Sequence, residues 1–265
     1  MTNTKIGFIG IGKMGSILMD GFLNSGLVSK NNVLAYDSDQ KKNKSASKKG
    51  IKIALNNSQL VSNSDLIFLA VKPQVMQTVL DEISNVSQGK LFVSIAAGVS
   101  IKKIEKKLKG RVIRVMPNTL CAIQQGVSAY SLGKKATKKD DQQVERLLKT
   151  LGTTIKVNEK QLDAVTGLSG SGPAYIYYII KSLAEAGKEE GLSEETALKL
   201  AAQTAKGAAE MIQKTGKKPH QLIEDVCSPG GTTIEGLKKL EEGKVREALK
   251  KAVKAAAKRS RQLSR

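Results

Sequence analysis

Three closely spaced glycines near the start of the chain lie where a short apolar run meets a helix-like pattern. The run Ile6–Ile9 is followed at once by Gly10-Ile11-Gly12-Lys13-Met14-Gly15. In a turn of this spacing the first glycine allows the tight bend, the second lets backbone amides approach a pyrophosphate, and the third lets the helix pack closely on the strand. The helix N-terminus adds partial positive charge. The pattern predicts a dinucleotide-binding turn, with an ordinary strand-to-helix turn as the alternative. Its predicted binding residues are Gly10, Gly12, Lys13, Met14 and Gly15.

A carboxylate, Asp37, ends the next apolar run, 22 residues after Gly15. An acidic side chain in this position accepts hydrogen bonds from the adenosine ribose and repels a 2′-phosphate, which favours NADH. Ser38, Lys41 and Lys42 follow, and lysines there can neutralise such a phosphate, which favours NADPH. Asp37 could also simply cap the next helix. The choice between NADH and NADPH therefore stays open, with Asp37 favouring NADH.

The elements that must position these residues alternate regularly over the first 158 residues. Apolar runs predict strands at residues 5–9, 33–36, 51–54, 66–70, 91–95, 112–116, 126–131 and 153–157. Polar stretches between them predict helices at residues 13–25, 39–49, 58–63, 73–84, 101–108 and 137–151. Because the runs are apolar enough to be buried on both faces, we expect an α/β fold with a Rossmann-type, doubly wound, mainly parallel sheet.

From residue 159 onward, strand-like runs are absent and apolar residues recur every three or four positions. The chain of 265 residues is long enough for two cores. We therefore expect two domains, a dinucleotide-binding domain at 1–158 and an all-helical domain at 159–265. The alanine-rich helices of the second domain are expected to pack closely.

Composition excludes several other classes of protein. One histidine, His220, and two separated cysteines, Cys121 and Cys227, offer no metal-binding cluster, so no metal site is predicted. No run of eighteen apolar residues is present, so no membrane span is expected. The first residues do not form a signal-peptide pattern, and we expect a cytoplasmic protein.

The formal net charge of +20 raises the question of nucleic-acid binding. Residues 244–265 carry nine Lys or Arg against one Glu. These charges interleave with Val245, Leu249 and Val253 at helical spacing, which indicates the solvent-facing side of a packed helix. No nucleic-acid-binding motif accompanies them, so no nucleic-acid partner is predicted. A basic surface would still attract anionic cofactors and substrates.

Four further motifs, taken with the glycine turn, identify a resemblance to the pyrroline-5-carboxylate reductase family. Residues 70–74 (AVKPQ), 94–99 (SIAAGV) and 116–119 (MPNT) follow three predicted strands. The more specific motifs are in the helical half, at residues 163–175 (DAVTGLSGSGPAY) and 228–237 (SPGGTTIEGL). The resemblance runs through the whole chain in order. It departs at Lys218-Pro219-His220, where relatives usually place His-Pro-Gly, and at Leu120, usually a proline.

This resemblance implies reduction of 1-pyrroline-5-carboxylate, a cyclic imino acid, to L-proline by hydride from NADPH or NADH. A protonated imine can form from solvent, and the chain offers no obvious strong acid, so catalysis by alignment fits. Thr166 is then expected near the imine nitrogen as the catalytic residue and candidate for proton delivery. Ser171 is expected to line the pocket. A helix start with free amides would hold the substrate carboxylate, at Ser228, Gly230, Gly231, Thr232 and Thr233.

The resemblance also places the nicotinamide and its ribose beyond the ends of the later strands. The residues expected there are Ala70, Val71, Lys72, Pro73, Ala96, Ala97 and Asn118. The small residues at 96–98 leave room for a ring, although close backbone packing is the alternative explanation. Asn57 matches the position that approaches the adenosine ribose or its phosphate.

In this family the helical half dimerises by interleaving helices, and five such dimers often form a ring. We therefore expect the domain at 159–265 to bind substrate and to self-associate, as a homodimer at least. Two other interpretations stay open. One is a β-hydroxyacid-type dehydrogenase, which needs a lysine base such as Lys181, and the other is a non-catalytic dinucleotide sensor.

Overall fold

The computed structural model describes residues 4–263, and they form two compact units. The first unit contains the described residues up to Ser171 together with those from Lys254 onward. The second unit is Gly172–Val253. The predicted boundary between residues 158 and 159 falls within the first unit. The division into a dinucleotide-binding and a substrate-binding domain stays a prediction. Residues 1–3 and 264–265 of the predicted domains lie outside the described residues.

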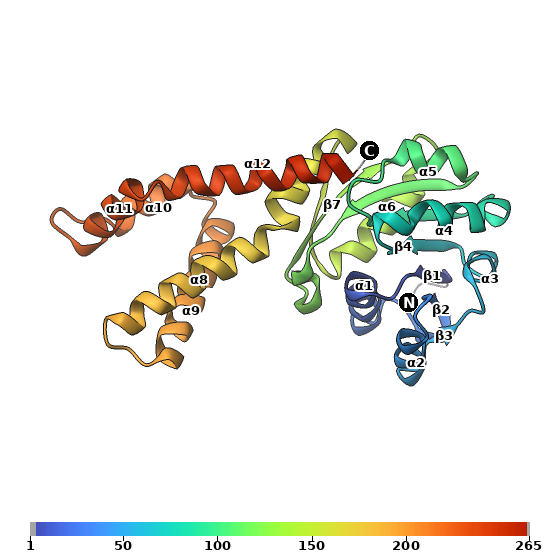
Figure 1. Ribbon diagram of the computed structural model, residues 1–265, viewed down its shortest axis with the longest axis horizontal. Helices are drawn as coiled ribbons and strands as arrows, with labels where there is room; N and C mark the ends of the chain where they lie inside the picture. The colour runs from blue at the N-terminus through green and yellow to red at the C-terminus, as the bar shows by residue number, and fades with distance from the viewer. Residues whose placement is uncertain (1–3, 264–265) are drawn as a thin grey trace. The chain divides into compact units, whose positions relative to one another are not determined.

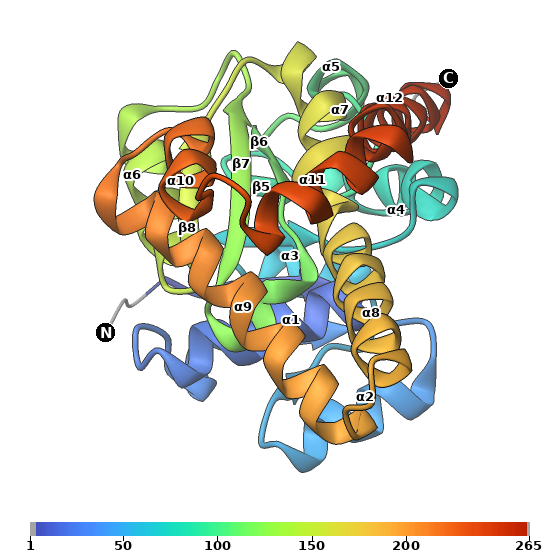
Figure 2. The same ribbon diagram turned by 90° about the vertical axis from the view of Figure 1, so that its left-hand side faces the viewer.

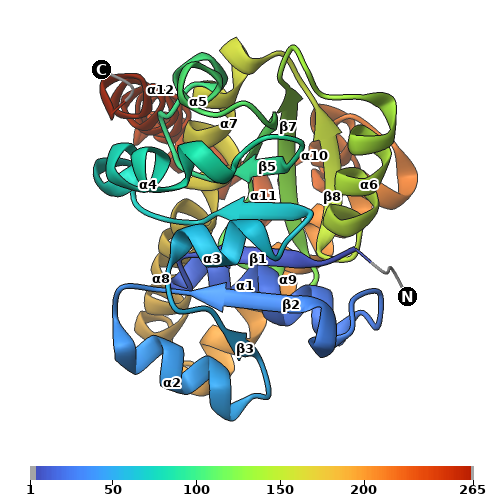
Figure 3. The ribbon, with the colours of Figure 1, turned by 90° about the vertical axis from the view of Figure 1, so that its right-hand side faces the viewer.

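A single sheet organises the first unit, with its strands in the order β3-β2-β1-β4-β5-β6-β7-β8 (Figure 3). All neighbouring strands are parallel except β6 and β7. The predicted doubly wound, mainly parallel sheet is confirmed. The strands are β1 (Ile6–Ile9), β2 (Val33–Tyr36), β3 (Lys52–Ile53), β4 (Leu66–Leu69), β5 (Leu91–Ser94), β6 (Arg111–Met116), β7 (Gly126–Leu132) and β8 (Gly152–Lys156).

Helices cover both faces of this sheet. On one face α1 (Lys13–Asn24), α2 (Gln40–Lys48) and α6 (Lys138–Lys149) share a buried cluster with Phe8 and Phe68. On the other, α3 (Asn57–Ser62), α4 (Met76–Ile83) and α5 (Ile101–Lys107) share one with Ile9 and Ile67. Successive residues of a strand point to opposite faces, so the central strands must be apolar throughout. All four residues of β1 and of β4 are buried.

The helix expected at residues 73–84 begins instead as a short 3₁₀ turn at Pro73–Val75, and α4 follows it. Lys72, just before this turn, has an extended backbone. A proline disfavours the helical conformation for the residue before it. The chain therefore leaves β4 in an extended segment before it turns into the helix.

Short helices lead out of the sheet, namely a 3₁₀ turn at Glu159–Gln161, α7 (Leu162–Val165) and a π-helical turn at Thr166–Gly170. The other unit contains α8 (Gly172–Glu189), α9 (Glu194–Thr215), α10 (Pro219–Val226), α11 (Thr232–Glu242) and the start of α12 (Val245–Leu263). Helices α8 and α9 fold back on each other and pack side by side (Figures 1 and 2). Gly191, in the left-handed region with φ +96°, lies at the bend, and Ser193 caps α9.

The close packing expected of the alanine-rich helices is limited within one chain. In α8 and α9 the buried residues are Pro173, Ala197 and Ala201. On α12, the lysines and arginines are exposed as predicted, Val245 and Val253 are half-buried, and Leu249 is exposed within this chain. Among residues 4–263, no helix combines the length and apolar character that a bilayer crossing demands.

Candidate active site

The glycine turn joins β1 to α1 and has the geometry that its spacing predicts. Gly10 has φ +91°, and a Cβ there would lie 2.8 Å from the carbonyl oxygen of Ala70. A Cβ on Gly15 would overlap the carbonyl oxygen of Gly10. Gly12 is the N-cap of α1, makes no side-chain cap and has open space where its Cβ would stand. The turn thus fits a pyrophosphate, because the start of α1 has no side-chain cap and Gly12 leaves open space beside it.

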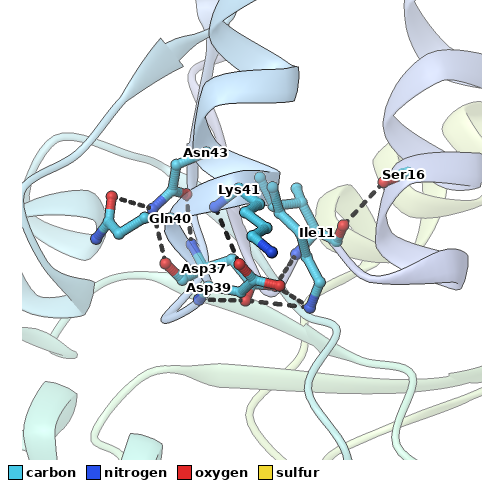
Figure 4. A network of polar contacts seen from close by, with 8 residues as sticks. Ile11, Ser16, Asp37, Asp39, Gln40, Lys41 and Asn43 are labelled. Atoms are coloured by element: carbon cyan, nitrogen blue, oxygen red, sulfur yellow. Dashed lines mark hydrogen bonds and ion pairs between the residues drawn. The ribbon is translucent and has the colours of Figure 1, made fainter.

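Asp37, at the end of β2, ties the glycine turn to the next loop (Figure 4). Its carboxylate accepts hydrogen bonds from the backbone amides of Ile11 and Asp39, each at 2.9 Å. The ammonium of Lys42 lies 3.3 Å from both carboxylate oxygens. The cap of α2 is Asp39, which accepts from Lys41 N at 2.9 Å. Asp37 therefore stabilises the conformation of the glycine turn. A role as helix cap alone does not explain these contacts, because Asp39 is the cap of α2.

A cavity of about 230 Å³ opens beside Asp37, at the carboxyl ends of β1, β2 and β4. Asn57, predicted from the resemblance, lies in its wall and donates from Nδ2 to Glu82 Oε2 at 2.6 Å. The sequence analysis did not predict the cavity wall that α4 and the 3₁₀ turn before it contribute. The signal was present, because these residues follow a helical spacing of three and four that puts them on one face. They are Val75, Thr78, Val79 and Glu82.

The remaining predicted cofactor residues lie where β4, β5 and β6 end. These three strands are parallel, so their carboxyl ends share one edge of the sheet. Ala96 is buried, Ala97 is half-buried and Lys72 is exposed. The segments at this edge are Ala70, Val71, Lys72, Pro73, then Ala96 and Ala97, then Asn118. The structure thus brings these predicted residues to the same edge as the glycine turn.

Asn118 is buried, and both ends of its amide are bonded. Its Oδ1 accepts from the amides of Leu120 and Val127, at 3.2 and 3.3 Å. Its Nδ2 donates to the carbonyl oxygen of Ser169 at 3.2 Å. Asn118 therefore fastens the turn Thr166–Gly170 to the end of β6.

The Thr166–Gly170 turn is π-helical, with Ser171 N donating to Thr166 O at 2.9 Å. Such turns are rare in proteins, and those that occur are often found at functional sites. The Thr166 hydroxyl donates to Leu162 O at 2.8 Å, and both Thr166 and Ser171 are half-buried. Thr166 therefore presents oxygen lone pairs, since its proton is already used. The π geometry could not be foreseen from residue types.

In the helical unit, the motif at Ser228–Thr233 forms the start of α11. Gly230 has φ +72°, and Gly231 N donates to Ser228 O at 2.9 Å in a tight turn. Gly231 is the N-cap and provides no side-chain cap, so the first amides of the helix lack such a partner. Ser228, Gly230 and Thr232 are exposed, and Thr233 is half-buried. The predicted anion-binding features are therefore present at this helix start.

Titratable groups offer little acid–base chemistry. Burial raises the pKa of the Cys121 thiol, and Cys227 is half-buried rather than fully buried. His220 is exposed in the first turn of α10. Over residues 4–263, no group of three or more His, Cys, Asp or Glu side chains is arranged to hold a metal ion.

Comparison with known proteins decides the family. Residues 159–263 match the pyrroline-5-carboxylate reductase dimerisation family, and residues 5–98 match the family described as NADP oxidoreductase coenzyme F420-dependent. The chain is 44% identical to the pyrroline-5-carboxylate reductase of Arabidopsis thaliana, over 98% of this chain and 95% of that one. It is also 44% identical to that of Methanosarcina acetivorans, over 100% of both. The chain belongs to the pyrroline-5-carboxylate reductase family.

Solved structures agree with this membership. The pyrroline carboxylate reductase of Plasmodium falciparum, solved with NADP bound, has a TM-score of 0.93 and 34% identity, over 100% of both chains. The enzyme of Coxiella burnetii has a TM-score of 0.91 and 35% identity, again over 100% of both. The predicted family, fold and NAD(P)H-dependent oxidoreductase activity of the pyrroline-5-carboxylate reductase type are confirmed. The dimerisation-family match supports self-association through the C-terminal helices.

Proposed function

We propose that this chain reduces 1-pyrroline-5-carboxylate to L-proline with the residues predicted above, and that it does so by alignment. The observation that carries the proposal is the start of α11, a helix N-terminus in the 228–237 motif without a side-chain cap. A protein that only bound a dinucleotide would have no use for a second anion site. The substrate carboxylate supplies the anion for it.

The glycine turn and the ends of β4, β5 and β6 would hold the cofactor along one edge of the sheet. When bound there, it supplies the hydride that attacks the ring carbon of the C=N bond. Gly12 leaves room for its pyrophosphate, and Ala96 and Ala97 leave room for its nicotinamide ring. Holding donor and acceptor carbons close together can remove about 7 kcal/mol from the barrier.

Thr166 orients the protonated substrate. Its hydroxyl donates to Leu162 O at 2.8 Å, so its lone pairs can accept the N–H of an iminium ion. Proton delivery by Thr166 would require this bond to break and water to resupply the proton. We therefore assign Thr166 as hydrogen-bond acceptor for an imine that solvent has already protonated. Ser171 completes the pocket beside it.

Assembly and setting follow the same family pattern. The chain acts as a homodimer built by the C-terminal helices, with a ring of five dimers as the larger form. Related cyclic imino acids with a six-membered ring fit the same groups, since they carry the same C=N bond and carboxylate. The setting is the cytoplasm, with no nucleic-acid partner.

Steady-state kinetics of the purified chain with 1-pyrroline-5-carboxylate tests this proposal, with NADH and NADPH compared. Oxidation of the cofactor with formation of proline is expected. A β-hydroxyacid and its oxidised cofactor serve as the control pair and should not react. Cofactor binding without turnover of the imine would instead identify a dinucleotide sensor.

A further inference from the structure

The side chain of Asn57 is held in one orientation by Glu82. Asn57 is the first residue of α3, and it is 7% exposed. Its Nδ2 donates to Glu82 Oε2 at 2.6 Å. A carboxylate only accepts hydrogen bonds, so the opposite orientation of the amide would bring two oxygens together. Glu82 therefore turns the amide oxygen of Asn57 away from itself.

That oxygen, Asn57 Oδ1, is buried and has no hydrogen-bond partner within residues 4–263. A buried acceptor without a donor costs roughly 1–3 kcal/mol. Native proteins leave few such groups, and each one calls for an explanation. Asn57 also lines the cavity beside Asp37, so a ligand bound there would lie next to the amide that Glu82 orients.

The charges around the cavity have one sign. Its lining includes two carboxylates, Asp37 and Glu82, and no Lys or Arg among the residues that the structure describes there. An opposing charge, Lys42, is paired with Asp37 at 3.3 Å and lines a separate cavity beside Gly12. The wall beside Asn57 thus presents the carboxylates of Asp37 and Glu82, and Glu82 fixes the orientation of the Asn57 amide.

The two dinucleotides differ at one group of the adenosine ribose. NADH has a 2′-hydroxyl, which can donate a hydrogen bond. NADPH has a phosphate there, which carries about −1.5 to −2 charges and offers acceptor oxygens. An acceptor oxygen next to a carboxylate suits the hydroxyl and disfavours the phosphate. We propose that Glu82, through its charge and through its hold on Asn57, biases the chain toward NADH.

Glu82 is a specificity residue in this scheme, and the proposal rests on the placement of the cofactor given above. The variant Glu82→Gln removes the charge, while its amide can still bond Asn57 in either orientation. We expect the ratio of dissociation constants, Kd for NADPH over Kd for NADH, to fall by about five- to tenfold, mainly through tighter NADPH binding. Fluorescence titration without imine measures both constants. The fragments 2′,5′-ADP and 5′-AMP should show the same shift, because they report on the adenosine end alone.

The matched control is Asp81→Asn, on the same helix. Asp81 is an exposed carboxylate that pairs with Lys107 at 2.7 Å, and it does not line the cavity. The Asp81→Asn variant removes the same charge one residue away and should leave the ratio of the two dissociation constants unchanged. Thermal melts of both variants verify that the fold is retained.

Two results would overturn the proposal. One is a Glu82→Gln variant that changes both cofactors alike, and the other is an equal shift of the ratio in Asp81→Asn. If the unaltered chain binds the dinucleotides but does not reduce the imine, the reaction fails while the role of Glu82 is still measured. If it binds neither, the cofactor edge itself is misplaced and this proposal falls with it.

Discussion

The two units of this chain bury apolar side chains to very different degrees. In the sheet unit, the central strands are buried on both faces, and Phe8 stacks on Phe68 with ring centroids 5.0 Å apart. In the helical unit, large apolar side chains stay exposed on α8, α9 and α10. They include Tyr177 (57%), Tyr178 (73%), Leu183 (53%), Leu198 (51%), Leu200 (54%), Met211 (51%) and Val226 (66%).

The two units therefore form their hydrophobic cores in different ways. The sheet unit encloses its own core within one chain. Exposed apolar surface on this scale marks an interaction site, and residues 159–263 match a dimerisation family. The helical unit is therefore expected to complete its core with a second copy of the chain.

The largest effect is expected from a charge placed on that apolar surface. Met211 and Val226 line one apolar cavity of about 430 Å³. Met211→Glu or Val226→Glu should weaken self-association by more than about a hundredfold. The reason is that an unpaired charge in an apolar interface costs about 3 kcal/mol or more. Sedimentation equilibrium measures the change.

The matched control for this comparison is Leu55→Glu in the sheet unit. Leu55 is even more exposed, at 79%, and the same charge there should leave the association constant unaltered. Equal dissociation by Leu55→Glu, or none by either helical variant, would break the proposed contrast.

Smaller effects are expected from alanine substitutions in the glycine turn, which distinguish a loss of stability from a loss of cofactor binding. Gly15→Ala must displace the backbone, since its Cβ would overlap Gly10 O, and should lower both the melting temperature and cofactor affinity. Gly12→Ala has open space and should leave the melting temperature nearly unchanged. Its methyl group should still weaken NADH binding by about tenfold, because it stands where the pyrophosphate approaches. Calorimetric titration and melting curves distinguish the two, and tight NADH binding by Gly12→Ala would contradict the site.

The smallest effect concerns Asp140, in the sheet unit. Burial alone would raise the pKa of this carboxyl, but hydrogen bonds from Thr137 and the Arg111 guanidinium at 2.8 Å outweigh burial and lower it. A lowered pKa means that the stabilisation is present above the ordinary pKa of about 3.9 and is lost as pH falls through the pKa of the folded chain. Asp140→Asn should therefore cost about 1–2 kcal/mol at pH 7.

That cost should begin to shrink below roughly pH 4, where the carboxyl of the unfolded chain takes up its proton, and should vanish as pH falls through the lowered pKa of the folded chain. Urea denaturation at several pH values measures it. The loss at pH 7 should not depend on protein concentration, because the sheet unit needs no partner for this contact. A concentration-dependent loss would show that the two units are not independent in this respect.

Sequence patterns predicted the sheet well because its rules are local. A strand buried on both faces, such as Ile6–Ile9, shows its burial in its composition, and Gly10 and Gly15 are required by contacts with the adjacent backbone. The cofactor edge follows from the parallel strand order. The helical half was predicted as helices, but its buried face could not be read within one chain, since its partners are expected on another copy.

Other parts of the site depend on contacts between distant residues. The bond between Asn57 and Glu82 joins residues 25 apart, and the Asn118–Ser169 bond spans 51. Neither spacing has a local signature. The π-helical turn at Thr166 likewise depends on how the chain leaves α7, and our proposal of Thr166 as acceptor rather than proton donor rests on the bond from its hydroxyl to Leu162 O.

The central claim is that cofactor and substrate are held by separate sets of residues. Its most direct test is a pair of measurements on Thr233→Val and Thr166→Val, namely kcat/KM for 1-pyrroline-5-carboxylate and the dissociation constant of NADH. Thr204→Val, an exposed position on α9, is the matched control. We predict that kcat/KM falls by about tenfold or more in both variants, while the NADH dissociation constant stays within about twofold. Equal losses of turnover and of NADH affinity would contradict the account and show that the substrate has been placed wrongly.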